Sequence, residues 1–149
     1  MSPKTKYPND KPFINKVFVY GTLLKDFWNY KRYLEGRVTR ITPAKTKGLL
    51  YHLPEGYPGL LPGEGITKGE VMEPVDEVLL KSLDSLEGYV VGRSNNLYNR
   101  DVQSVITEDG EEILCWVYFY NNEKFAKENG ILVSDGDWRE FLKSRGELI

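Results

Sequence analysis

The sequence contains one cysteine and one histidine. Cys115 has no second cysteine for an internal disulfide bond, which fits a reducing compartment. A zinc site built from several Cys and His side chains is excluded for the same reason. A Cys–His pair or a Ser–His–Asp triad would depend on His52 alone. We set both aside, because Cys115 lies in an apolar run typical of a core strand and no nucleophile elbow is present.

Excess charge and long apolar runs are also missing. The formal net charge is −2, with 20 Lys and Arg against 22 Asp and Glu. This balance gives no basic footprint for nucleic acid or for an anionic membrane. No apolar run approaches the roughly 20 residues of a membrane span, and the polar N-terminal segment lacks the apolar part of a secretory signal. We expect a cytoplasmic protein whose partner is neither a nucleic acid nor a membrane.

The length and composition indicate one folded domain. The chain has 149 residues, of which 40% are hydrophobic and 13% aromatic, enough for one substantial core. We expect residues 1–15 to form a flexible leader and residues 16–149 to form the domain. The first strand, residues 17–20, is apolar on both faces and should therefore be central and buried.

The rest of the chain indicates strands interrupted by short helices. Asp26 is expected to cap a helix that Gly36 closes, and Asp137 to cap another near the C-terminus. Residues 53–65 are dense in Pro and Gly and predict a surface loop. The predicted strands are residues 37–41, 47–53 and 66–73, and a hairpin of residues 98–107 and 112–120 around an Asp-Gly turn. The fold class predicted is α+β, a single domain with a mixed, strongly curved or barrel-like sheet.

Residues 74–88 form the clearest predicted helix, and Glu87 lies near its end. Leucines recur there at spacings of three and four, and Gly88 ends the pattern. At about 100° per residue, Glu87 projects with Leu80 and Leu83 toward the interior. The plainer alternative is a solvated carboxylate that rotates outward. If Glu87 faces inward, partial burial and the helix C-terminus should both raise its pKa, which suits a general base.

Gly21 follows the first strand directly. Because glycine has no Cβ, a ligand could approach the backbone N–H groups of this bend closely, although many such bends are only turns. Tyr98 and Arg100 share one face of their strand, and either could be structural. Residues 57–59, Tyr-Pro-Gly, are interpreted as a turn.

Together these stretches resemble the γ-glutamylcyclotransferase-like family, which includes γ-glutamylamine cyclotransferases and small AIG2-like bacterial proteins. The resemblance covers residues 17 to about 120. It is carried by the strings FVYGTL at 18–23, LDSLEGY at 83–89 and LYNR at 97–100, with shorter matches at 48–50, 57–58 and 68–71. It implies a small mixed β-barrel with peripheral helices. It also implies a cofactor-independent enzyme of the transferase or lyase type, acting on a small-molecule γ-glutamyl substrate.

The resemblance also implies roles for particular residues. Glu87 matches the catalytic glutamate of the family. The loop of Tyr20, Gly21, Thr22 and Leu23 would receive the α-amino and α-carboxylate end of a γ-glutamyl group, and Tyr98 would contact the substrate. Residues 54–65 and the C-terminal tail are expected to shape access to the site.

In the implied reaction, the substrate's own α-amine attacks its γ-carbonyl and closes a lactam. The products are 5-oxoproline and a free amine, and Glu87 moves the protons as general base and acid. Two alternatives stay open at the level of sequence. One is a ligand-binding or regulatory domain that keeps the pocket without turnover. The other is hydrolysis or transfer on a related γ-glutamyl-like amide.

Overall fold

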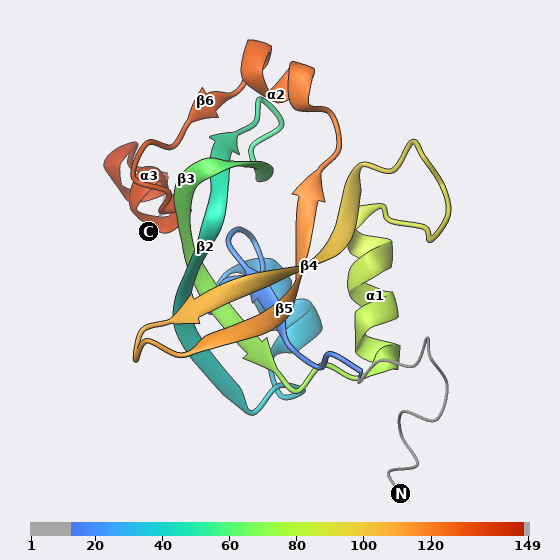
Figure 1. Ribbon diagram of the computed structural model, residues 1–149. Helices are drawn as coiled ribbons and strands as arrows, with labels where there is room; N and C mark the ends of the chain where they lie inside the picture. The colour runs from blue at the N-terminus through green and yellow to red at the C-terminus, as the bar shows by residue number, and fades with distance from the viewer. Residues whose placement is uncertain (1–12, 148–149) are drawn as a thin grey trace, which may run out of the picture.

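Five strands close into a small mixed β-barrel in the computed structural model, which describes residues 13–147 (Figure 1). The hydrogen-bonded ring runs β3–β1–β5–β4–β2 and closes through the β2–β3 pair. Among the strand pairs of residues 13–147, β1–β5 alone is parallel. The predicted barrel is therefore confirmed. The elements are β1 Val17–Val19, η2 Tyr30–Leu34, β2 Arg40–His52, β3 Pro58–Glu73, α1 Glu77–Glu87, β4 Tyr98–Thr107, β5 Glu112–Tyr120, α2 Glu123–Asn129, β6 Ile131–Leu132 and α3 Trp138–Ser144.

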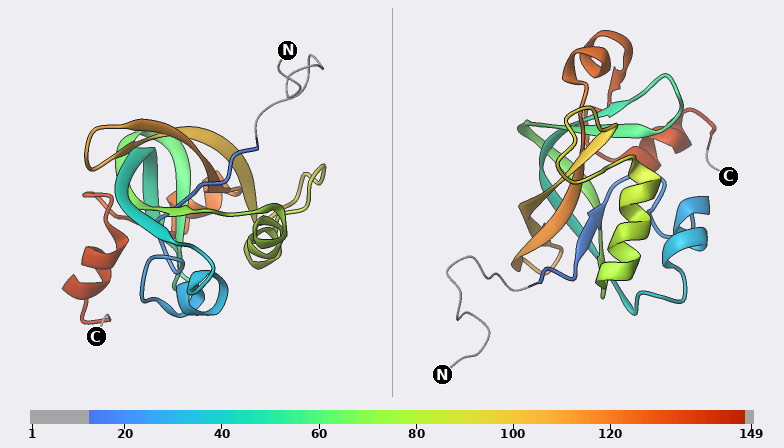
Figure 2. Two further views of the ribbon diagram at one scale, coloured as in Figure 1. Left: turned by 90° about the horizontal axis from the view of Figure 1, so that it is seen from below. Right: turned by 90° about the vertical axis from the view of Figure 1, so that its right-hand side faces the viewer.

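Helices surround the barrel on several sides. Figure 2 shows α1, η2 and α3 outside the ring of strands, separated from one another around it. No helix within residues 13–147 combines the length and hydropathy needed to cross a membrane. Most of the leader predicted for residues 1–15 lies outside the described residues.

The first strand is short, central and buried, as predicted. All three residues of β1 are at most 3% exposed. Val17 pairs with Met72 of β3 on one side and with Trp116 of β5 on the other. Strand pairing ends at Val19, so Tyr20 already belongs to the bend. The chain thus leaves the middle of the barrel wall at the predicted glycine.

The β2–β3 hairpin corrects the prediction for residues 37–65. Residues 40–52 form one strand instead of two, and β3 begins at Pro58, inside the expected surface loop. Leu60 and Leu61 in that stretch are fully buried and pair with β2. A Cβ on Gly63 would lie 2.7 Å from Leu49 Cγ, so this glycine permits close packing against the neighbouring strand. Tertiary packing overrides the Pro and Gly content here.

The first helix also differs from the prediction. Asp26 has a φ of 77° and does not cap it. The structure forms the π-helix η2 with Asn29 at its N-terminal boundary. Gly36 has a φ of 81°, as expected for a glycine just past a helix end. Trp28 is 61% exposed.

Helix α1 ends at the predicted glycine and the C-terminal helix begins at the predicted cap, whereas the cap at the start of α1, Asp76, was not predicted. The Asp76 side chain accepts a hydrogen bond from Leu79 N at 2.8 Å, and Gly88 closes α1 in the left-handed conformation. Asp137 accepts from Glu140 N at 3.1 Å and begins α3. The β4–β5 hairpin has the predicted bounds. The sequence interpretation did not include α2 and β6.

Candidate active site

One cavity of about 290 Å³ receives residues from several elements of the fold. The bend after β1, the β2–β3 turn, the end of α1, and strands β4 and β5 all contribute to it. All six predicted site residues line this cavity: Tyr20, Gly21, Thr22, Leu23, Glu87 and Tyr98. Segments more than 60 residues apart in the sequence are thus brought together in one place.

Glu87 is the last residue of α1 and faces the cavity. Its side chain is only partly exposed, and it has no hydrogen-bond or ion-pair partner within residues 13–147. Burial raises the pKa of Glu87 from 4.5 to about 7. Its negative charge is also one of the causes, after burial, that raise the pKa values of Tyr20 and Tyr98, which line the same cavity. The inward-facing interpretation of Glu87 is therefore correct.

The glycine bend offers three consecutive backbone donors. The N–H groups of Gly21, Thr22 and Leu23 have no acceptor among the described residues, whereas Gly21 O accepts from Leu24 N at 2.9 Å. A Cβ on Gly21 would lie 2.5 Å from Pro58 Cγ, so only glycine fits between the bend and β3. Successive unused N–H groups at a concave surface can bind an anion such as a carboxylate.

Two tyrosines hold the cavity walls together. Tyr20 Oη donates to Tyr118 O, and Tyr98 Oη donates to Pro58 O, each at 2.6 Å. Burial is the main cause that raises the pKa of both phenols, so both stay neutral at physiological pH. Because each hydroxyl proton is used within the protein, these oxygens can face a ligand only as acceptors. A contact from Tyr98 to substrate would involve its ring or an oxygen lone pair.

The sequence interpretation missed several cavity residues. Tyr57 lines the cavity, and its ring lies 6.4 Å from the ring of Tyr98. The turn predicted for residues 57–59 is wrong at Pro58 and Gly59, because these two residues begin β3 and pair with β2. Strand alternation puts Tyr118 and Tyr120 on one face of β5, and this signal could have revealed Tyr118. The other lining residues are Phe18, Val19, Trp28, Asn29, Glu55, Gly56, Pro58, Leu86 and Leu97.

Known proteins include relatives of this chain. The family model described as gamma-glutamyl cyclotransferase, AIG2-like, matches residues 17–140. The chain belongs to this family. A Methanocaldococcus jannaschii protein provisionally named a gamma-glutamylcyclotransferase is 39% identical over 127 residues, which cover 84% of this chain and 96% of that protein.

Two further proteins, one relative and one solved structure, are similar to this chain. The gamma-L-glutamyl-butirosin B gamma-glutamyl cyclotransferase of Niallia circulans is 33% identical over 138 residues, covering 92% of this chain and 83% of the relative. The crystal structure of YkqA from Bacillus subtilis superposes with a TM-score of 0.66 and 27% identity. It matches 90% of this chain, but this chain spans only 43% of YkqA.

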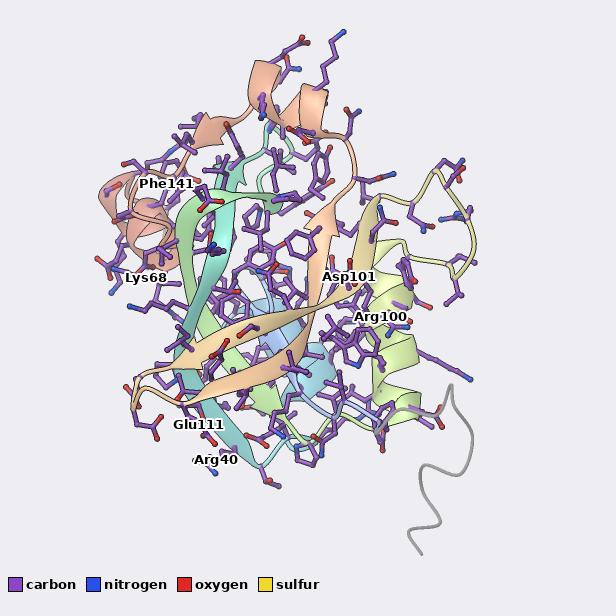
Figure 3. The ribbon with its side chains drawn as sticks, in the orientation of Figure 1. Arg40, Lys68, Arg100, Asp101, Glu111 and Phe141 are labelled. Carbon is purple, nitrogen blue, oxygen red and sulfur yellow. The ribbon has the colours of Figure 1, made fainter. Side chains whose placement is uncertain are left out.

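A network of hydrogen bonds around Asp84 adjoins the cavity, because Tyr118 belongs to both. Asp84, one turn before Glu87, accepts from Arg100 Nε at 2.8 Å and Nη2 at 3.1 Å. Tyr118 Oη also donates to Asp84, at 2.6 Å. Figure 3 shows Arg100 of β4 beside α1. The Arg100 guanidinium also lies 4.3 Å from the ring of Trp116.

This network connects α1 to β4 and β5, the two strands that contribute Tyr98 and Tyr118 to the cavity. Glu87 lies on the same helix, three residues after Asp84. The position of the Glu87 carboxylate therefore depends on the ion pair. Arg100 therefore has a structural role. The sequence alone left this role open for both Tyr98 and Arg100. Asp84 is buried in spite of its charge.

Cys115 and His52 lie outside the cavity, as their sequence contexts indicated. Cys115 is fully buried, and burial raises the pKa of its thiol to about 12. His52 Nδ1 accepts a hydrogen bond from Trp138 Nε1 at 3.0 Å, and burial lowers the pKa of this histidine. Both side chains serve the core.

Because the pKa of Glu87 is raised in the native state, we expect the free energy of unfolding to depend on pH. The native pKa of about 7 exceeds the unfolded value, so Glu87 favours the native state below pH 4.5 and loses this contribution as pH rises through 7. In Glu87→Gln the charge is absent at every pH. The variant should exceed the wild type in free energy of unfolding by about 3 kcal/mol at pH 8 and by less than about 1 kcal/mol at pH 5.

Urea denaturation of both proteins at the two pH values measures this difference. Glu77→Gln, an exposed position at the other end of α1, is the matched control and should show no such pH-dependent difference. An equal effect of Glu87→Gln at pH 5 and pH 8 would show that the carboxylate is solvated in the native state.

Proposed function

We propose that this protein converts a γ-glutamyl amide into 5-oxoproline and a free amine, with Glu87 as the general acid and base. The observation that carries the proposal is the shared cavity. Its lining includes a carboxylate that has no partner in residues 13–147 and has a pKa near neutrality, and also three residues whose backbone N–H groups have no acceptor there. The family match and the N. circulans relative, whose name specifies a γ-L-glutamyl compound, support the same substrate class.

The substrate supplies its own nucleophile in this scheme. Glu87 takes a proton from the α-ammonium group, and the freed amine attacks the γ-carbonyl carbon to form a five-membered ring. The protonated Glu87 gives this proton to the departing nitrogen, and the C–N bond breaks. The regenerated Glu87 carboxylate then takes the second proton from the ring nitrogen and passes it to the released amine. Overall, two protons move from the α-nitrogen to the leaving amine. No redox step or external nucleophile is needed, so the scheme requires no cofactor.

Positioning supplies the other part of the rate enhancement. The α-carboxylate would accept hydrogen bonds from the N–H groups of Gly21, Thr22 and Leu23, and Tyr98 would contact the bound glutamyl group. This arrangement holds the α-amine over its own γ-carbonyl. Such orientation can contribute roughly 7–11 kcal/mol toward the barrier.

A panel of γ-glutamyl compounds tests the proposal. We expect the wild type to release stoichiometric 5-oxoproline and free amine from at least one γ-glutamyl amide, measured by liquid chromatography with mass spectrometry. Release of glutamate would support hydrolysis instead, and a γ-glutamyl product carrying a new amine would support transfer. Saturable binding without any product would identify a binding or regulatory domain. The cytoplasmic location stays a prediction.

A further inference from the structure

The residues that line the cavity are buried at one end and exposed to solvent at its rim. Tyr20, Gly21 and Tyr98 are buried, and Glu87 is partly exposed, whereas four lining residues are exposed. These four define the rim: Trp28, Glu55, Gly56 and Leu97. If the glutamyl group occupies the buried end, the leaving amine and its substituent must extend past the rim.

The charge of this cavity is entirely negative. Its lining includes two carboxylates, Glu55 and Glu87, and no Lys, Arg or His. Glu55 lies in the turn between β2 and β3 and has no ion-pair or hydrogen-bond partner in residues 13–147. Glu55 and Tyr57 are two residues apart in this turn, and both line the cavity. Glu55 is therefore a free anion at the rim.

Aromatic groups near Glu55 suit a cation as well. Tyr57 adjoins it, and the exposed ring of Trp28 lines the same cavity. An ammonium group is attracted by a carboxylate and by the face of an aromatic ring. A carboxylate at the same place would meet only negative charge.

We propose that Glu55 selects γ-glutamyl amides whose leaving amine carries a second positive charge, as diamines and polyamines do, and disfavours leaving groups that carry a carboxylate. This inference rests on the proposed function, because it assigns the leaving group to the rim of that site. Glu55 acts in specificity and touches the distal part of the substrate, away from the reacting atoms.

Three isosteric substrates test the proposal: the mono-γ-L-glutamyl amides of 1,5-diaminopentane, pentylamine and 5-aminopentanoic acid. Their free ends are cationic, neutral and anionic at pH 8. The wild type should show kcat/KM about fivefold higher for the cationic than for the neutral amide, and lowest for the anionic one. Added salt should reduce these ratios, because the rim is exposed.

The variants separate charge from structure. Glu55→Gln should bring the cationic-to-neutral ratio to about one, and Glu55→Lys should make the anionic amide better than the cationic one. Both should leave kcat/KM for the neutral amide within about twofold. Glu111→Gln is the matched control, because Glu111 is an exposed turn glutamate at the tip of the β4–β5 hairpin (Figure 3).

The outcomes are distinct from failure of the proposed function. If no amide yields 5-oxoproline, the proposed function fails. If all three react and their ratios are unchanged in Glu55→Lys, the function stands and the assignment of Glu55 is wrong. The same conclusion follows if wild-type turnover favours the anionic amide.

Discussion

Glu87→Gln is expected to retain the fold and to lose about 10²- to 10⁴-fold in kcat for 5-oxoproline release, the range typical for loss of a general acid or base. The amide preserves the size of the side chain but cannot take a proton from the α-ammonium group. Because the carboxylate has no partner in residues 13–147, its replacement leaves no orphaned cation behind. The loss should therefore be one of chemistry rather than of structure.

The measurement compares initial rates of 5-oxoproline formation in the wild type and Glu87→Gln at saturating substrate. Glu77→Gln, on the first turn of the same helix, should retain wild-type kcat. Near-ultraviolet circular dichroism checks that tertiary packing is intact in both variants. A wild-type rate in Glu87→Gln would remove this residue from the mechanism.

Arg100→Leu should destabilise the protein by about 3–5 kcal/mol, because it leaves the Asp84 carboxylate buried without its cation. Both side chains of this ion pair are only 12% exposed, and two hydrogen bonds connect them. The substitution also removes the contact between the guanidinium and Trp116. Urea denaturation at pH 7 measures the free energy of unfolding.

Two further variants isolate the cause of that loss. Asp84→Asn/Arg100→Leu removes the orphaned charge and keeps an acceptor for Tyr118, so it should be more stable than Arg100→Leu alone. Lys127→Leu breaks the exposed pair with Glu123 at 2.7 Å and should lower the free energy of unfolding far less than Arg100→Leu does. If the double variant is less stable than Arg100→Leu, the loss arises from packing instead of an unpaired charge.

The sequence predicted well those elements whose signals are local. The leucine spacing and Gly88 defined α1, and the Asp-Gly turn defined the β4–β5 hairpin with its bounds. Failures occurred where packing overrides propensity. Residues 58–65 read as loop because of their Pro and Gly content, yet they form part of β3 against β2. At Asp26 a left-handed backbone replaced the expected cap.

The site shows the same division. Glu87 and the Gly21 bend could be identified from their local patterns and from the family resemblance. Glu55 and Tyr57 could not, because they lie in the turn between β2 and β3, which carries no periodic pattern. Tyr118 was missed, although strand alternation on β5 could have revealed it. These three residues meet only after β4, β5 and the β2–β3 turn close around α1.

The sequence by itself determined the family, a single barrel domain, and an inward-facing acid at the end of α1, since helical periodicity and short motifs depend on nearby residues. The tertiary structure decided which distant groups share the cavity with that acid. The tertiary structure also leaves the Glu87 carboxylate without an ion-pair or hydrogen-bond partner in residues 13–147, whereas Asp84, three residues earlier, is paired with Arg100. Burial and pairing depend on contacts between distant segments, and these contacts set the charge and pKa of each group.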